Sequence, residues 1–187
     1  MEIWDLFNAN RDPLYRTHIR GNKLKAGEYH VVVGIWVINA NGKLLLTKRS
    51  LQKEQYPDLW ENTYGSLLAG EINVDGALRE LYEETGIRAD KRDLQYCVTQ
   101  KTSTSFVDMY ILNSNILISK LVMQENETTE AKWVSIDQFK SMILDGQISP
   151  LVAKRYLLIH KKIDKVIFEL RCKLSMQNLS YSLKVNK

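Results

Sequence analysis

The sequence predicts an α/β sandwich, a mixed β-sheet covered by helices. Apolar, β-branched runs bounded by turn residues, such as residues 30–38, predict buried strands. Three segments with helical periodicity, each with start or stop residues, follow or alternate with these strands. Because strands and helices are intermixed along the chain, a sheet packed against helices is expected rather than a helical bundle.

The chain has 187 residues, of which 44% are hydrophobic and 26% charged. This composition is typical of a globular protein and excludes disordered, collagen-like and disulfide-rich classes. Because Gly and Pro are scattered singly, no linker separates two domains. We expect a strand and turn extension over residues 1–29, the main domain over 30–148, and a C-terminal helix and tail packed on it over 149–187.

Charge and cysteine content exclude several kinds of partner. The net charge is +4, and the lysines clustered after residue 160 are interpreted as a solvated helix face, so no nucleic-acid polymer is expected. Cys97 and Cys172 lie far apart, which predicts neither a zinc site nor a disulfide framework. No signal peptide or membrane span is evident, so a cytoplasmic protein is the expectation.

The strands are predicted from apolar runs and turn residues. Residues 3–7 predict a short strand followed by a turn, and 30–38 with 43–48 predict a hairpin turning at Asn39–Gly42. Further strands are expected at 95–101, 106–113 and 132–134, completing a mixed sheet.

The helices are predicted at residues 74–85, 136–145 and 151–170. Ser135 and Ser149 are expected N-caps, Pro150 suits a first helical position, and Gly146 separates the last two helices. The final helix carries an apolar stripe through Leu157, Ile163, Ile167 and Leu170, followed by a polar tail. We interpret this helix as a packing or dimer helix, so a homodimer is possible.

Residues 65–87 carry the chemistry: a loop, a helix and a stop. Asn73 is the expected N-cap, and Gly86 ends the helix in a left-handed conformation. At about 100° per residue, Glu80, Glu83 and Glu84 share one face, well separated from the apolar face.

Three carboxylates within one turn repel each other, so something must compensate for their charge. Hard oxygen ligands of this kind suit Mg²⁺, with Mn²⁺ as an alternative ion. Gly76, one turn earlier, is expected to leave room for ions or substrate. A merely solvated acidic helix face does not account for the Gly-x₅-Glu loop that precedes it.

The segment resembles the Nudix box, Gly-x₅-Glu-x₇-Arg-Glu-U-x-Glu-Glu-x-Gly-U, where U is a bulky aliphatic residue. All of its fixed positions are matched, over 23 residues, by Gly65, Glu71, Arg79, Glu80, Leu81, Glu83, Glu84, Gly86 and Ile87. The resemblance extends over about residues 30–145 and implies the Nudix fold, an α/β/α sandwich with a mixed β-sheet and a catalytic loop-helix.

The resemblance also implies roles for the matched residues. Glu80, Glu83 and Glu84 would bind the metal, and the Gly65 carbonyl would add a ligand. Arg79 would orient the acids through a salt bridge, and Glu71 would support the loop, with Gly70 and Gly86 shaping its ends. A further carboxylate often precedes a late tryptophan. Glu127 is the candidate before Trp133, with Glu130 and Glu125 as alternatives, and either Glu80 or Glu127 would be the base.

The implied function is Mg²⁺-dependent hydrolysis of a pyrophosphate bond in a nucleoside diphosphate linked to another moiety, by water attack on phosphorus. Cations and aromatic rings outside the box would select this small-molecule substrate. The candidates are Arg49, Lys48, Trp60, Tyr110 and Arg20.

Two alternatives are left open. The approach Tyr56–Thr63 is similar to that of isopentenyl-diphosphate isomerases, but their catalytic cysteine and metal-binding histidine fall here on Tyr64 and Ser66. A non-catalytic nucleotide sensor is the second alternative, and the intact acids of the box argue against it.

Overall fold

The computed structural model describes residues 2–185, and side chains through residue 176. A seven-stranded mixed sheet forms its centre, in the order β5-β4-β3-β8-β7, with β6 paired to β3 and β9 paired to β4. The strands are β3 (His30–Ile38), β4 (Leu44–Arg49), β5 (Trp60–Glu61), β6 (Thr63–Ser66), β7 (Leu94–Lys101), β8 (Ser105–Asn113) and β9 (Thr128–Val134).

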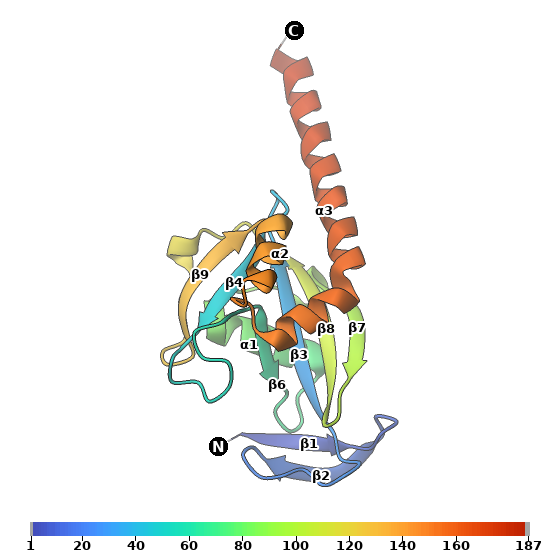
Figure 1. Cartoon of the computed structure of the whole chain (residues 1–187). Helices are drawn as coiled ribbons and strands as arrows, with labels where there is room; N and C mark the ends of the chain where they lie inside the picture. Colours follow the sequence, from blue (N-terminus) through green and yellow to red (C-terminus); the bar gives the residue numbers. More distant parts are fainter. Residues whose placement is uncertain (1, 186–187) are drawn as a thin grey trace.

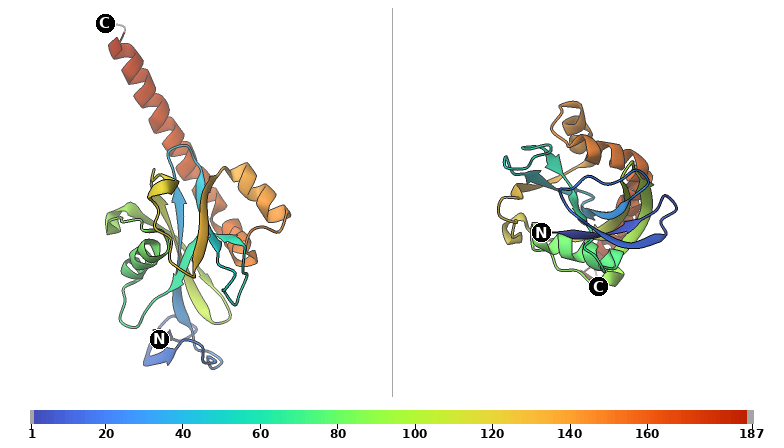
Figure 2. Two further views of the ribbon diagram at one scale, coloured as in Figure 1. Left: turned by 90° about the vertical axis from the view of Figure 1, so that its left-hand side faces the viewer. Right: turned by 90° about the horizontal axis from the view of Figure 1, so that it is seen from below.

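Helices cover both faces of this sheet (Figures 1 and 2), which confirms the predicted α/β/α sandwich. Helix α1 (Asn73–Thr85) packs on one face, where Leu81 meets Val33 and Ile35 of β3. Helices α2 (Ile136–Leu144) and α3 (Pro150–Val185) cover the other face, around Trp36. Trp36 is fully buried in this core, whereas Trp133 is only partly buried.

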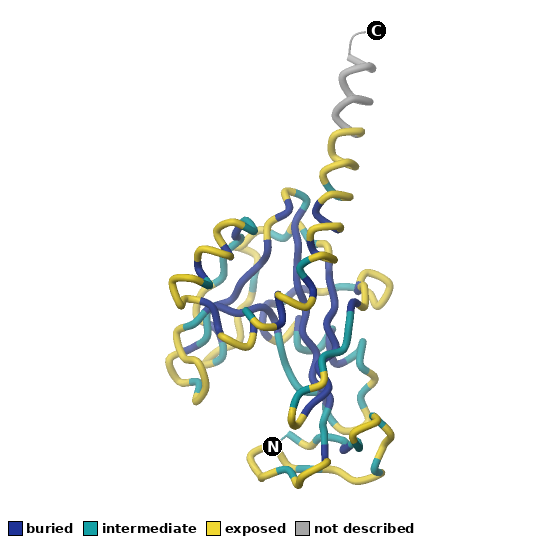
Figure 3. The backbone as a smooth tube through the Cα atoms, turned by 45° about the vertical axis from the view of Figure 1, so that its right-hand side comes forward, coloured by how far each residue is buried: buried dark blue, intermediate teal, exposed yellow. Residues whose placement is uncertain are grey.

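The central strands are continuously apolar because both of their faces are covered. Strand β3 pairs in parallel with β8 along nine residues, and eight of its nine residues are buried. Such strands show no polar alternation, so the apolar runs in the sequence were a sufficient signal. The buried strands form the dark centre of the molecule in Figure 3.

The predicted hairpin of β3 and β4 exists, but its strands diverge soon after the turn. Only Ile38 and Leu44 are register partners between them. Beyond this point β3 pairs with β6, while β4 pairs with β5 and β9. Residues 63–66 are therefore a strand, although 65 and 66 were expected to begin a loop, and 128–131 extend the strand expected at 132–134. This splits the sheet into two halves at the site described below.

The N-terminal segment is a hairpin rather than one strand and a turn. Strands β1 (Ile3–Phe7) and β2 (Pro13–Ile19) form a separate two-stranded sheet at the end of the molecule opposite the C-terminus (Figure 1). Strand β2 was missed because it is mostly exposed and has no apolar alternation. The η1 (Lys91–Asp93) and η2 (Ile118–Lys120) turns complete the fold.

The C-terminal helix is longer than predicted. It continues through Val185 instead of ending at Leu170, because residues 171–185 contain no Gly or Pro to stop it. Its buried stripe includes Ile163 and Ile167 as expected, but Leu157 is exposed. The last two residues of the expected polar tail, 186–187, lie outside the described residues.

The capping predictions for α2 are confirmed. Ser135 accepts a hydrogen bond from the backbone N–H of Gln138, whose side chain accepts one from the Ser135 N–H. Gly146 follows with a φ of 68°, so it ends the segment in the left-handed region. Across the described residues, no helix has the length and apolar character needed to cross a bilayer.

Candidate active site

Helix α1 presents the acidic residues on a rigid element. Leu81 and Ala77 anchor its inner face at 0% exposure, and Gly86 ends it with a φ of 70° and a hydrogen bond from its N–H to the Tyr82 carbonyl. Asn73 is not the N-cap, because the helix already includes it and Ile72 precedes it. Its amide instead donates to Asp108 of β8, which ties the helix start to the sheet.

Gly76 has a packing role that differs from the expected one. A Cβ at this position would lie 2.0 Å from Leu67 Cδ2 and 3.0 Å from Glu71 Oε2. The missing side chain therefore allows the helix to approach its own preceding loop and does not leave room for ions or substrate.

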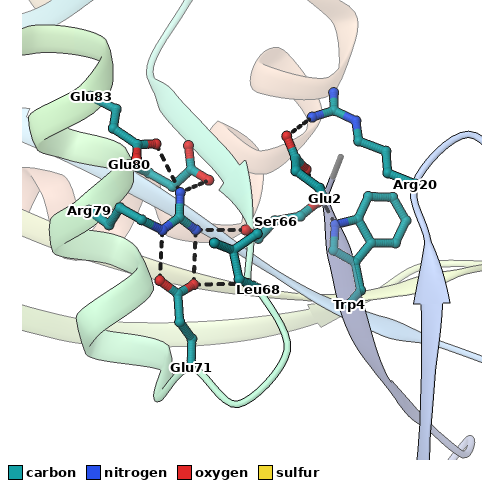
Figure 4. Close-up of polar contacts among 9 residues, drawn as sticks. All are labelled: Glu2, Trp4, Arg20, Ser66, Leu68, Glu71, Arg79, Glu80 and Glu83. Carbon is teal, nitrogen blue, oxygen red and sulfur yellow. Dashed lines mark hydrogen bonds and ion pairs between the residues drawn. The ribbon is translucent and has the colours of Figure 1, made fainter.

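Arg79 gathers the loop and the acids around one guanidinium (Figure 4). Its Nε and Nη2 donate to the two carboxylate oxygens of Glu71, at 2.6 and 2.9 Å. Nη1 donates to Glu80 and to Glu83, both at 2.9 Å, and Nη2 also donates to the Ser66 carbonyl at 3.0 Å. These contacts match the orienting position that the sequence predicted for Arg79.

Glu71 closes the loop in front of the helix. It accepts a hydrogen bond of 2.8 Å from the Leu68 N–H, besides the two from Arg79. Partial burial raises the pKa of Glu71, but these hydrogen bonds outweigh it, so its pKa is lower than usual. Glu71 therefore stays ionised and holds the loop to the helix.

Glu80 lies directly against Gly65 of β6. A Cβ on Gly65 would lie 1.9 Å from Glu80 Cδ, so any side chain there would force the Glu80 carboxylate to move. Burial raises the pKa of Glu80 to about 7, although Arg79 acts in the opposite direction. The strand thus forms a cradle for this carboxylate.

Glu84 is the carboxylate with the least compensation. Its exposed fraction is 7%, and its Oε2 has no hydrogen-bond partner. Burial, followed by the charges of Glu61, Glu80 and Glu127, raises its pKa well above the usual value, and the Tyr64 backbone N–H opposes this. A buried carboxylate surrounded by like charges calls for a cation.

Glu61 is a site residue that the sequence analysis missed. It lies on β5, is 7% exposed, and receives a hydrogen bond of 2.6 Å from Arg49 Nη1. Burial raises the pKa of Glu61 despite Arg49. No local sequence pattern indicates this, because the burial of Glu61 depends on the pairing of β5 with β4.

Glu127 approaches the same acids from the loop before β9. Its carboxylate is paired with Lys53, and its backbone carbonyl accepts from the Ser50 N–H at 2.9 Å. Its charge acts on Glu84, whereas Glu130 pairs with Lys48 and Glu125 is exposed. Of the three acids considered, Glu127 is thus the one whose charge reaches the site.

The donor set fits a divalent cation. Among the described residues, no three His, Cys, Asp or Glu side chains already meet at one point, since Arg79 holds Glu80 and Glu83, and Lys53 holds Glu127. The unpartnered oxygen of Glu84 and the cradle at Gly65 are nevertheless what a hard cation with oxygen ligands requires.

The five residues expected to select the substrate do not converge. Arg49 lies beside Glu61 and hence close to the acids, and Arg20 pairs with Glu2 on the hairpin, whose charge acts on Glu80. The other three lie apart: Lys48 is paired with Asp58 and Glu130, Trp60 lies under Lys132, and Tyr110 is buried in the α1 core.

The N-terminal hairpin holds the catalytic loop from outside. The Asp5 carboxylate accepts from the Gly70 N–H at 2.7 Å, and the Ile3 carbonyl accepts from the Ala69 N–H at 2.8 Å. At the hairpin turn, Arg11 donates to both oxygens of Asp108, the residue that also binds Asn73. The hairpin therefore fixes both the loop and the start of α1.

A catalytic loop-helix beneath a split mixed sheet, with buried acids gathered by one arginine, defines a class of enzymes that act on phosphoanhydrides. The family model of the NUDIX domain matches residues 28–154. The chain belongs to the Nudix family, and it is a hydrolase that acts on pyrophosphate bonds.

Two relatives mark the range of similarity. An uncharacterized Nudix hydrolase of Listeria monocytogenes is 34% identical over 151 residues, which is 80% of this chain and 89% of that protein. The isopentenyl-diphosphate Delta-isomerase of Escherichia coli is 25% identical over 128 residues, 65% of this chain and 68% of the isomerase. The resemblance to isomerases seen in the sequence is thus real but weaker.

Solved structures show the same fold. DR0079 of Deinococcus radiodurans superposes with a TM-score of 0.67 at 21% identity, over 83% of this chain and 99% of that one. A bifunctional NMN adenylyltransferase/ADP ribose pyrophosphatase of Francisella tularensis, complexed with AMP and a Mn ion, gives 0.58 at 18% identity, over 76% and 43%.

Proposed function

We propose that this protein is a Mg²⁺-dependent hydrolase that splits the pyrophosphate bond of a nucleoside diphosphate linked to another moiety. The observation that carries the proposal is the buried, unpartnered Glu84 oxygen among the charges of Glu61, Glu80 and Glu127. A divalent cation compensates these charges and also binds the phosphates of a substrate. Mn²⁺ is the alternative ion.

The cation would be held by Glu80, Glu83 and Glu84, with the Gly65 carbonyl as a further ligand. When bound, it neutralises charge that develops on the phosphate oxygens and lowers the pKa of a bound water. Arg79 keeps Glu80 and Glu83 oriented, while Glu71 holds Arg79 in place.

A carboxylate must accept the proton of the water that attacks phosphorus. Glu80 and Glu127 are the two candidates, and both act electrostatically on Glu84. Glu127 lies on a loop and would have to release Lys53 to act. Glu127→Gln separates the two candidates: loss of turnover with substrate and metal still bound identifies Glu127 as the base, and retained turnover leaves Glu80.

The isomerase alternative is less favoured. Tyr64 and Ser66 stand where isomerases carry a cysteine and a histidine, and neither side chain supplies a thiol or an imidazole. The homodimer and the cytoplasmic location expected from the sequence stay predictions.

The test is turnover of a panel of nucleoside diphosphate derivatives with Mg²⁺ or Mn²⁺, including ADP-ribose because the Francisella relative is named for it. We expect metal-dependent phosphoanhydride cleavage that Glu84→Gln reduces on the order of 100-fold or more. Glu169→Gln, on the exposed side of α3, is the matched control. Isomerisation of isopentenyl diphosphate without any hydrolysis would overturn the proposal.

A further inference from the structure

Helix α3 sends one arginine into the interior beside the candidate site. Arg155 is 4% exposed, and its guanidinium carbon lies 3.7 Å from the centre of the Tyr64 ring. Tyr64 directly precedes Gly65 on β6 and pairs with Gly34 of β3. The guanidinium therefore lies against the strand that carries the Glu80 cradle, on the side opposite α1.

The chain places Arg155 there through the start of α3. The Trp60 N–H donates to the Gln147 carbonyl at 2.9 Å, and the Ser149 N–H donates to the Trp60 carbonyl at 3.0 Å. These bonds fix residues 147–149 beside β5, and the helix begins at Pro150. Arg155 follows in the second turn, so its direction is set by β5 and not by a flexible loop.

The positive charge of Arg155 has no ion-pair partner among the described side chains. Its nearby carboxylate, Glu61, is paired with Arg49. Burial lowers the pKa of Arg155, and Tyr64 and Glu61 only partly offset this effect. A buried cation in this state gains from an anion that brings hydrogen-bond acceptors.

The Glu84 carboxylate and the Arg155 guanidinium are thus two opposite charges without full compensation, and they lie on either side of Tyr64. The Tyr64 backbone N–H stabilises Glu84, and the Tyr64 ring carries Arg155. The strands diverge here, since β3 pairs with β6 while β4 pairs with β5. A phosphate group with a bound divalent cation supplies both missing charges. The cation compensates Glu84, and the phosphate oxygens accept hydrogen bonds from Arg155.

We propose that Arg155 is a substrate-binding residue that donates hydrogen bonds to a phosphate oxygen of the pyrophosphate substrate. This inference rests on the proposed function and adds a residue outside the Nudix box. Stacking on Tyr64 holds the planar guanidinium in one orientation, which suits bidentate recognition of a phosphate better than a lysine would.

The experiment is titration calorimetry of inorganic pyrophosphate into the full chain at a fixed excess of Mg²⁺. Arg155→Met is expected to weaken binding about tenfold or more. Arg155→Lys, which keeps the charge but not the fork, is expected to fall between it and the unchanged protein. Lys154→Met, one residue earlier and exposed, is the control and is expected to bind normally.

A structural role for Arg155 is separated by a second pair of variants. If Arg155 only neutralises Glu61, then Glu61→Gln restores binding in the Arg155→Met background, and the proposal is overturned. If it binds phosphate, the double variant stays weak. Thermal melting first shows which variants fold. If Arg155→Met does not fold, Arg155→Lys and Arg155→Gln are compared with the unchanged protein instead.

Two further outcomes overturn the inference without touching the proposed function. Arg155→Met could bind pyrophosphate as tightly as the unchanged protein, or the unchanged protein could fail to bind it. In either case Glu84→Gln still decides the hydrolase proposal on the nucleotide panel, because that assay does not depend on Arg155.

Discussion

At the scale of single residues, the site depends on the absence of a side chain at Gly65. Gly65 has an ordinary φ, so its backbone does not require glycine, but the Glu80 carboxylate occupies the space of a side chain. The box pattern places both residues, and the sequence therefore predicted them. The contact between them is a property of the folded chain alone.

Gly65→Ala tests this contact. The added methyl group must displace Glu80, and a misplacement of about 1 Å costs on the order of 100-fold in rate, so kcat is expected to fall by that amount. Gly34→Ala is the matched control, because a Cβ there meets its nearest neighbours at 3.7 Å, an ordinary contact. Equal activity of the two variants would show that Glu80 does not need its observed position.

Residues missed by the sequence reasoning share one property: they are buried charges far from the box. Glu61 and Arg155 have no local pattern that distinguishes them from exposed charges, because their burial depends on strand pairing and on α3. Asn73 shows the converse, since a good local capping residue is taken by a distant acid, Asp108.

At the scale of elements, the loop-helix is held by the hairpin of β1 and β2. The backbone N–H groups of Ala69 and Gly70 are bound by the carbonyl of Ile3 and the carboxylate of Asp5. The loop includes Glu71, which in turn holds Arg79. Through this series of contacts the hairpin influences the orientation of the acids.

Asp5→Ala is expected to lower kcat about three- to tenfold with little loss of stability, because water can replace the exposed hydrogen bond but not its geometry. Asp12→Ala is the control, since Asp12 lies on the same hairpin and bonds only within its own turn. Steady-state kinetics check the rate, and faster amide hydrogen exchange at residues 68–71 checks the cause. An unchanged kcat would contradict a positioning role for the hairpin.

Strands and helices with a high apolar content were predicted more accurately from the sequence than exposed, polar ones. Strands β3 and β8 were predicted almost to the residue, because continuous β-branched runs need no knowledge of their partners. Strand β2 and the length of α3 were not, since exposed polar segments carry weak periodicity. The divergence of β3 from β4 also has no local signal, as it depends on which strand each one pairs with.

At the scale of the whole molecule, the site costs stability when no cation is bound. The pKa of Glu80 is about 7 in the folded chain against 4.5 as the ordinary value, so the folded state binds its proton more tightly. Stability therefore decreases as pH rises from about 4.5 through 7, by on the order of 3 kcal/mol for this group. Glu84, whose pKa is also raised, acts in the same direction.

Urea unfolding in EDTA at pH 4.5 and pH 8 checks this effect. Glu80→Gln is expected to be more stable than the unchanged protein at pH 8 and similar to it at pH 4.5. The partly buried His30, with its pKa lowered to about 4, has the opposite trend, but it is common to both proteins and cancels. Saturating Mg²⁺ should stabilise the unchanged protein more than the variant. If Glu80→Gln were less stable than the unchanged protein at pH 8, the stability cost assigned to Glu80 would be wrong.

The family match covers residues 28–154, whereas Asp5 and Arg155 both lie outside it. The hairpin contact at Asp5 and the proposed substrate contact of Arg155 thus come from residues just outside the matched domain. A fragment limited to residues 28–154 would therefore keep the acids of the loop-helix but lose the hairpin contacts that hold the loop at Ala69 and Gly70.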